Sequence, residues 1–404
     1  MPRKAFDADH SGRAGSAGAA VQPAPSPAIV TMGALERLLV LGAGAGQLGL
    51  LAAARARGLF VIAVDRDAGA PGFRYADRRA IVSVEDEPAL ERLAEAARID
   101  GVIAPGADWP VGPAARIAAR LGLAHPISPE TAVLSTSKLR QRERFAEAGV
   151  PQTGWRVVSK PDEVVGVPCL VRAPDRHGSR ARALVRSSRE LRAAVKTALR
   201  ASRIGLCLVE EVVEEPVVTV SAFSRAGAFH ALTVTDRAPL THLWESEHAE
   251  PAVAVARQAA EAIGIREGAT VTQLRIGPDG PHVLALSART GGGHEAELCQ
   301  AALGVDLNGL ALSAALGEPI SERRLRPRCE VGGACVLFLT GSGEAQGLEE
   351  AESAPGIEWA RVYRGSDRAG AVLATGESRA EALERATRAA EYVRFRAADA
   401  QALA

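Results

Sequence analysis

The sequence predicts an α/β protein that begins with a parallel sheet and continues into a β-rich central part. Over residues 37–122, apolar strand-like segments alternate with helix-like segments, which is typical of a parallel sheet covered by helices. From Trp155 onward the strand-like segments are short, and few helices separate them. Hydrophobic residues make up 47% of the 404 residues and aromatic residues only 4%, so we expect large cores built from aliphatic side chains.

The charge balance argues against several classes of protein. The chain has 48 basic and 48 acidic residues, which disfavours a nucleic-acid binder that relies on bulk positive charge. No apolar run is long enough to span a bilayer, so we expect no membrane partner. The five cysteines lack paired spacing and the N-terminus lacks an apolar signal segment, which favours reduced thiols in the cytoplasm.

Composition divides the chain into a tail and three folded parts. Residues 1–33 are rich in Gly, Ala, Ser and Pro, and we expect them to form a disordered tail. Met32 stands just before the first strand-like segment and is an alternative start of translation. The folded parts are expected at residues 34–128, 129–316 and 317–404.

The first folded part opens with a glycine-rich turn between two strand-like segments. In GAGAGQLG, the residues Gly44, Gly46 and Gly49 have G-x-G-x-x-G spacing, and Asp65 ends the next strand. This pattern is found where a dinucleotide binds at the N-terminus of a helix. It is found equally where glycines let a helix pack closely on a sheet, so the motif by itself leaves both interpretations open.

The central and C-terminal parts have their own patterns. Residues 127–151 predict one long helix with an early Ser/Thr cluster, ending near Gly149 and Pro151. Helices are also expected over 190–203 and 252–262, and a hairpin with a Pro-Asp-Gly turn over 270–290. Three strands and a closing helix over 378–395 complete the chain.

An ordered series of segments resembles the ATP-grasp superfamily, in the branch of carboxylate–amine ligases that includes amino-acid and dipeptide ligases. The matching blocks, in order, are GAGAGQLG, DGVIAPGADWPVGPAARIAARLGL, SPETAVLSTSKLRQRERFAEAGVP, ALTVTDR, HVLALSARTGGGH, ALGVDLNGL and GAVLATGESRAEALERA. The resemblance covers nearly everything after the tail. It implies a Rossmann-like first domain that does not use NAD, two central ATP-grasp α+β lobes with a nucleotide cleft between them, and a small C-terminal α/β segment.

The resemblance also implies a set of nucleotide contacts. ATP-grasp ligases form an acyl phosphate, which needs cations over the triphosphate. Only four of the 48 basic residues are lysines, and one of them, Lys138, stands where the family has its first nucleotide lysine. Arg172 replaces the second lysine and keeps the charge in a bulkier, planar form. The further contacts implied are Gly178, Ser179 and Arg180 in the covering loop, Glu210 and Glu211 at the adenine hinge, and Glu214 or Glu215 at the ribose.

The magnesium ligands of the family depart from its pattern in this chain. The first metal-binding Glu corresponds to Gln273, the second to Ala285, and the Asn two residues later to Ser287. Magnesium prefers charged oxygen ligands, so Gln273 and Ser287 predict a weak, degenerate site. Glu295 and Glu297 are alternative ligands, although exposed acids at the start of a helix are the simpler interpretation.

One segment, which overlaps the further matching block SEHAEPA, gathers residue types that bind metals. His242, Glu245, Glu247 and His248 stand together in THLWESEH. We expect this segment to be a mobile loop, and a solvated His/Glu loop is the more common case than a metal site.

Two functions remain open from the sequence. The first is an ATP-dependent ligase that joins a small carboxylate to a small amine, with Arg289 gripping the substrate carboxylate or the γ-phosphate. The second is a catalytically inactive ATP-grasp protein that binds a nucleotide or small ligand, or supports a partner protein. The resemblance argues for the first and the lost carboxylates for the second, because fold alone does not establish activity. Related ligases are often dimers, so a homodimer is an expectation for either function.

Overall fold

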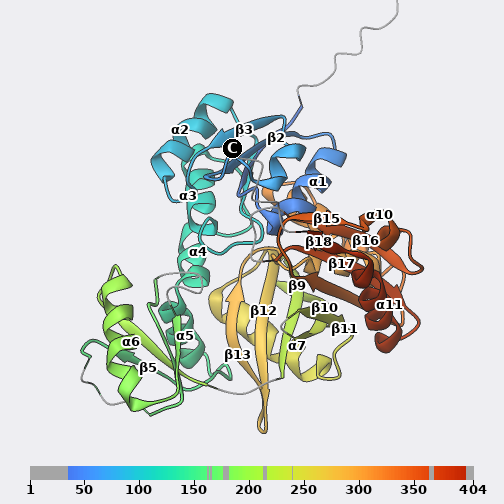
Figure 1. The fold of residues 1–404 in the computed structure, drawn as a ribbon. Coiled ribbons are helices and arrows are strands. Elements are labelled where there is room, and N and C mark those ends of the chain that lie inside the picture. The colour runs from blue at the N-terminus through green and yellow to red at the C-terminus, as the bar shows by residue number, and fades with distance from the viewer. Residues whose placement is uncertain are drawn as a thin grey trace, which may run out of the picture. The chain divides into compact units, whose positions relative to one another are not determined.

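The first sheet of the computed structural model is parallel, as the alternating segments predict. Its strands are β1 (Arg37–Leu41), β2 (Phe60–Asp65), β3 (Arg78–Ile81) and β4 (Gly101–Ile103), in the order β3-β2-β1-β4. Helix α1 (Leu48–Ala56) packs with one set of strand side chains, and α2 (Glu87–Ala97) and α3 (Val111–Leu121) pack with the other (Figure 1). Both sets are aliphatic, which explains how the chain builds a core with few aromatic residues.

The structure describes residues 35–161, 163, 166–175, 182–212, 216–238, 240–363 and 368–396. The expected disordered tail, residues 1–33 with Met32, lies outside this range, and so do five of the residues named above as nucleotide or ribose contacts: Gly178, Ser179, Arg180, Glu214 and Glu215. None of the helices in the described residues combines the length and the apolar composition needed to cross a bilayer.

The long helix predicted after the first sheet is wrong at one position, because the chain breaks it at Ser137. Helix α4 (Pro129–Thr136) ends there and α5 (Lys138–Glu147) begins. The Ser137 hydroxyl accepts a hydrogen bond from the backbone N–H of Arg140 at 3.4 Å, which caps the new helix. Short hydroxyl side chains compete with the helical backbone in this way. Lys138 therefore stands at the first residue of a helix, not in the middle of one.

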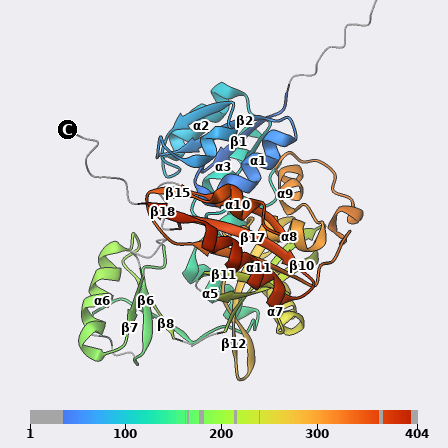
Figure 2. The same ribbon diagram turned by 45° about the vertical axis from the view of Figure 1, so that its right-hand side comes forward.

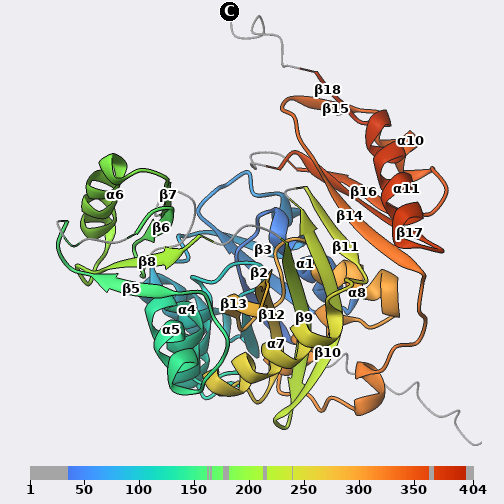
Figure 3. The ribbon, with the colours of Figure 1, turned by 90° about the horizontal axis from the view of Figure 1, so that it is seen from below.

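A four-stranded antiparallel sheet follows, with the order β5-β8-β6-β7. Its strands are β5 (Trp155–Val158), β6 (Cys169–Arg172), β7 (Arg182–Val185) and β8 (Cys207–Glu211). The helix predicted over 190–203 is α6 (Ser188–Ala201), which buries Leu191 and Val195 against this sheet. Figures 1 and 3 show α6 and the sheet as one layered unit, set beside α5.

The largest sheet has eight strands in the order β13-β12-β9-β10-β11-β14-β17-β16. Its strands are β9 (Val217–Arg225), β10 (Ala228–Ala238), β11 (Thr241–Trp244), β12 (Gly268–Gly277), β13 (Gly280–Ser287), β14 (Gly333–Leu339), β16 (Ile357–Val362) and β17 (Gly370–Gly376). The predicted hairpin is confirmed, since Gly277 pairs with Gly280 across its turn. Pairing of β11 with β14 continues the sheet into the predicted C-terminal part (Figure 2).

Helices cover both parts of this sheet. Helix α7 (Ala249–Ile263) packs on β9, β10, β12 and β13, and α11 (Arg379–Tyr392) packs on β14 and β17 (Figure 3). Helices α8 (Glu295–Leu303) and α9 (Leu307–Ala315) connect the two parts, and α10 (Leu348–Glu352) with the short strands β15 (Glu344–Gln346) and β18 (Arg394–Arg396) completes the structure. The mixed α/β class is thus confirmed, whereas the boundaries 34–128, 129–316 and 317–404 stay predictions.

Candidate functional site

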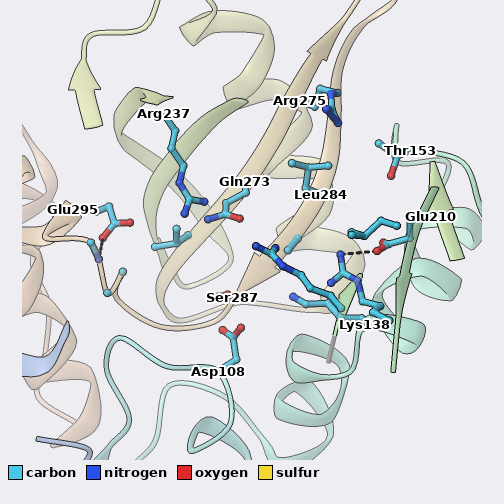
Figure 4. A pocket seen from close by; sticks show the side chains of 18 of the residues that line it. Asp108, Lys138, Thr153, Glu210, Arg237, Gln273, Arg275, Leu284, Ser287 and Glu295 are labelled. Atoms are coloured by element: carbon cyan, nitrogen blue, oxygen red, sulfur yellow. Dashed lines mark hydrogen bonds and ion pairs between the residues drawn. The ribbon is translucent and has the colours of Figure 1, made fainter. Parts of the chain in front are cut away.

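A cavity of about 800 Å³ lies where the four-stranded sheet faces the eight-stranded sheet (Figure 4). Helix α5 and strands β6 and β8 line one side, and strands β12 and β13 and the glycine run before α8 line the other. The structure brings together the following residues that the sequence singles out: Lys138, Arg172, Glu210, Glu211, Gln273, Ala285, Ser287 and Arg289. The covering-loop and ribose residues, Gly178, Ser179, Arg180 and Glu214, lie outside the described residues.

Glu210 joins two arginines at the wall of this cavity. The Arg142 Nε and Nη2 atoms donate to Glu210 Oε1 at 2.9 and 2.6 Å, and Arg172 Nη2 lies 2.5 Å from Glu210 Oε2. Arg142 and Glu210 are buried, and Arg142 also donates to the backbone carbonyls of Val283 and Leu284. The carboxylate therefore fixes Arg172 at the cavity wall. Arg142 lies in the matching block SPETAVLSTSKLRQRERFAEAGVP, but the resemblance assigns it no role, and residue type alone cannot distinguish it from the other 43 arginines.

Lys138 is half-buried among these positive charges. Its backbone N–H donates to the carbonyl of Pro174 at 3.3 Å, which places the start of α5 beside the end of β6. Loss of solvent on burial lowers the pKa of the Lys138 ammonium, and Arg172, Arg142 and Arg289 lower it further, against the opposing effect of Asp108. An ammonium surrounded in this way is a receptor for an anion, because a bound anion would relieve the repulsion.

Arg289 is held by Asp108, a loop residue that follows the first sheet. Its Nε and Nη2 atoms lie 2.8 and 2.7 Å from Asp108 Oδ1, and its Nη1 donates to the carbonyl of Thr290 at 2.9 Å. Asp108 follows β4, in the loop that starts α3. The N-terminal part of the chain thus contributes directly to the cavity, through a residue that motif comparison did not identify.

The paired strands β12 and β13 present no carboxylate at the expected metal position. Gln273 lies directly opposite Ala285, and Ser287 lies opposite Val271 on the same face. No group of three or more His, Cys, Asp or Glu side chains that could hold a metal occurs within the described part of the chain. The residues present at this position therefore do not fit a magnesium ion, which needs charged oxygen ligands.

Glu295 and His242 close the far end of the cavity, and both expectations for them are wrong. Glu295 is buried, not an exposed acid, and accepts the backbone N–H of Gly293 at 2.7 Å. His242 belongs to strand β11, not to a mobile loop, and its Nε2 lies 3.9 Å from Glu295 Oε1. Burial lowers the pKa of His242 to about 4, with Arg237 and Arg368 adding to the effect against Glu295, so the imidazole is neutral at pH 7.

Glu297 lies outside the cavity and packs closely against Gly49 of the glycine turn. Its Oε1 lies 2.9 Å from His294 Nδ1 and 3.2 Å from Arg361 Nη1, and it does not line the cavity. A methyl group at Gly49 would come within 2.3 Å of the same oxygen, so glycine is needed there for close approach. The Asp65 carboxylate accepts the N–H of Ala43 inside the turn. The packing interpretation of the glycine turn therefore accounts for the contacts of Gly49 and Asp65.

The cavity as a whole carries an excess of positive charge. Among the described residues that line it are eight Lys or Arg side chains and four carboxylates. The arginines that the sequence did not select are Arg142, Arg182, Arg237, Arg275 and Arg368. Such an excess inside a cavity attracts a polyanion, of which a triphosphate is the one that the resemblance to ATP-grasp proteins implies.

The chain is similar to several known proteins. No protein-family model matches the chain. The uncharacterized protein y4rH of Sinorhizobium fredii is 27% identical over 299 residues, which cover 66% of this chain and 62% of that protein, so the chain spans less than two thirds of that relative. A formate-dependent phosphoribosylglycinamide formyltransferase of Burkholderia pseudomallei is 26% identical, covering 89% of this chain and 95% of the enzyme.

Solved structures of ligases share the fold over most of the chain. An L-amino acid ligase from Bacillus licheniformis has a TM-score of 0.75 at 18% identity, covering 90% of this chain and 99% of its own. A biotin carboxylase from Campylobacter jejuni, solved as a β-γ-ATP complex, has a TM-score of 0.71 at 18% identity, covering 89% and 92%. The fold is that of the ATP-grasp carboxylate–amine ligases. The resemblance predicted from the sequence is thereby confirmed.

Proposed function

We propose that this chain binds ATP in the cavity between its four-stranded and eight-stranded sheets. The observation that carries the proposal is the excess of cations in a cavity of the ATP-grasp fold. Lys138, Arg172 and Arg289 would contact the phosphates, since guanidinium and ammonium groups donate strong hydrogen bonds to phosphate oxygens. Glu210, Glu211 and Glu214 would lie at the adenine and ribose end, and the loop with Gly178, Ser179 and Arg180 would cover the phosphates.

The activity that the fold supports is ligation of a small carboxylate to a small amine. The substrate carboxylate would attack the γ-phosphorus and release ADP, and the amine would then attack the acyl phosphate, release phosphate and lose a proton. Arg289 would grip the carboxylate or the γ-phosphate, held in position by Asp108. The names of the related formyltransferase and of the L-amino acid ligase support this class of reaction.

A second function, nucleotide binding without ligation, is favoured by one observation. Gln273, Ala285 and Ser287 stand where the resemblance places the magnesium ligands, and none of them carries a charge. These residues support a degenerate Mg²⁺ site, and phosphoryl transfer normally depends on that ion.

Calorimetric titration with ATP, followed by an assay of phosphate release in a mixture of amino acids, separates these functions. Binding together with amino-acid-dependent phosphate release supports the ligase. Binding without release supports the second function. Absence of binding contradicts both.

The contribution of Arg172 can be tested by Arg172→Ala. We expect ATP affinity to fall by about tenfold, equivalent to about 1.4 kcal/mol, because one phosphate contact is lost. Arg140→Ala is the matched control, since Arg140 is exposed on α5 and does not line the cavity. Arg172→Lys should retain most of the affinity. An unchanged affinity of Arg172→Ala would remove this residue from the site.

A further inference from the structure

We propose that the chain takes its nucleotide as the metal-free polyphosphate, and that the guanidinium of Arg237 supplies the positive charge that magnesium supplies in related enzymes. The inference rests on the proposed nucleotide binding and adds the charge state of the ligand. It starts from the misfit between the residues of β12 and β13 and a magnesium ion.

The carboxylates that line the cavity are largely engaged by other groups. Asp108 is held by Arg289 at 2.7 Å, and Glu210 by Arg142 and Arg172 at 2.6 and 2.5 Å. Glu295 accepts the Gly293 N–H at 2.7 Å. The fourth, Glu211, lies at the hinge end on β8, where it accepts the backbone N–H of Gly154. A divalent ion beside Gln273 that took Glu210 or Glu295 as a ligand would have to displace a buried carboxylate from its present partners, at a large free-energy cost.

Arg237 stands beside the position that lacks the metal ligands. It pairs with Val217 of β9, and Arg275 of β12 pairs with the same residue from the other side. Gln273 and Thr219 form the next row on the same face, because side chains two residues apart in a strand point the same way. Figure 4 shows the Arg237 guanidinium reaching down toward the Gln273 amide.

The surroundings of Arg237 suit an anion. In the part of the chain that the structure describes, no ion pair or hydrogen bond engages its guanidinium. Its positive charge contributes to the lowered pKa of the neighbouring His242, as does that of Arg368. A guanidinium presents five N–H donors and can bind a phosphate through two parallel hydrogen bonds.

These observations together favour the metal-free ligand. A magnesium ion bound here would carry two positive charges and would be repelled by the Arg237 guanidinium. At a separation of about 4 Å, this repulsion is large even in a partly solvated cavity. Free ATP carries about two more negative charges than its magnesium complex at neutral pH, so the excess of cations attracts it more strongly. We therefore expect magnesium to weaken nucleotide binding here.

Titration calorimetry of the full chain with ATP tests this, once in EDTA and once with magnesium in excess over nucleotide. The expected result is an affinity at least tenfold higher in EDTA. Equal affinity, or tighter binding with magnesium, overturns the inference while leaving the proposed function intact. Absence of binding in both buffers overturns the proposed function itself.

Two sets of variants test the assignment to Arg237. Arg237→Gln should lower the affinity in EDTA by at least tenfold and reduce the difference between the buffers, whereas Arg140→Gln should change neither. The triple variant Gln273→Glu, Ala285→Glu, Ser287→Asn restores the ligands that the family uses. The quadruple variant, which also carries Arg237→Gln, should bind ATP more tightly with magnesium than without it. If Arg237→Gln folds, as judged by circular dichroism, and keeps the full affinity in EDTA, then Arg237 does not have this role.

Discussion

The buried carboxylate of Glu210 offers the sharpest test of how the cavity is built, through the substitution Glu210→Gln. The change keeps the shape of the side chain and removes its charge. Three short contacts join Glu210 to two guanidinium groups, at 2.9 and 2.6 Å from Arg142 and at 2.5 Å from Arg172. After the substitution, the two guanidinium groups remain close together without the negative charge between them.

The size of the effect follows from burial. The side chains of Glu210 and Arg142 are each only 3% exposed, so water cannot stabilise the Arg142 guanidinium once the charge of Glu210 is removed. Removing one partner of such a buried pair costs about 3–5 kcal/mol. Arg172 is more exposed, at 19%, and Arg172→Gln leaves the pair between Glu210 and Arg142 intact, so we expect a smaller loss of about 1–2 kcal/mol.

Urea unfolding, monitored by circular dichroism, measures these losses as a shift in midpoint at unchanged slope. Glu211→Gln is the matched control, because Glu211 is the exposed neighbour on the same strand and should change stability by less than about 0.5 kcal/mol. In the double variant of Glu210→Gln with Arg142→Gln, the two losses should not add. A loss below about 1 kcal/mol for Glu210→Gln would refute this account of the buried network.

Two further predictions concern His242 and the glycine turn. The pKa of His242 is lowered to about 4 from 6.5, so the unfolded chain takes up a proton below pH 6.5 while the folded chain does not. The free energy of unfolding should therefore decrease by up to about 3 kcal/mol as the pH falls from 6.5 to 4. In His242→Gln, this free energy, measured by chemical unfolding at each pH, should depend less steeply on pH. The same pH dependence as in the unchanged protein would count against the prediction. Gly49→Ala should destabilise the fold by about 1–3 kcal/mol, because its methyl group would come within 2.3 Å of Glu297, whereas Gly166→Ala, with open space around it, should be nearly neutral in the same assay. Equal midpoints for these two variants would contradict the packing interpretation of the turn.

Features that depend on neighbours in sequence could be predicted. The strands and helices of the first sheet follow from alternating apolar segments. The hairpin of β12 and β13 follows from its short Pro-Asp-Gly turn, although a bulge between Gln273 and Leu274, which no local pattern marks, shifts the register and places Gln273 opposite Ala285. Lys138 could be selected because lysine is rare in this chain and the resemblance has one at that position. The structure places all three residues at the same cavity.

Features that depend on distant contacts could not be predicted. Asp108 meets Arg289 across 181 positions of sequence, and no local pattern marks either of them as a pair. Glu295 has the sequence context of an exposed acid at a helix start, and it is buried because the glycine run and β11 fold over it. The break at Ser137 also escaped prediction, since Ser and Thr occur inside helices as well as at their ends.

The arginine-rich composition explains both the missed residues and the chemistry that we propose. With 44 arginines in the chain, Arg237 could not be distinguished by residue type, and a net charge of zero gave no indication of a local excess. Yet the excess arises because acidic residues are missing from one place, the face of β12 and β13, while arginines from β10 and β12 remain there. Carboxylate metal ligands and an arginine that replaces the metal cannot both act at such a position, because the carboxylates would pair with Arg237 and cancel its attraction for phosphate. The absence of carboxylates on β12 and β13 and the presence of Arg237 beside them therefore both make the site more positive, and titration with and without magnesium measures the effect directly.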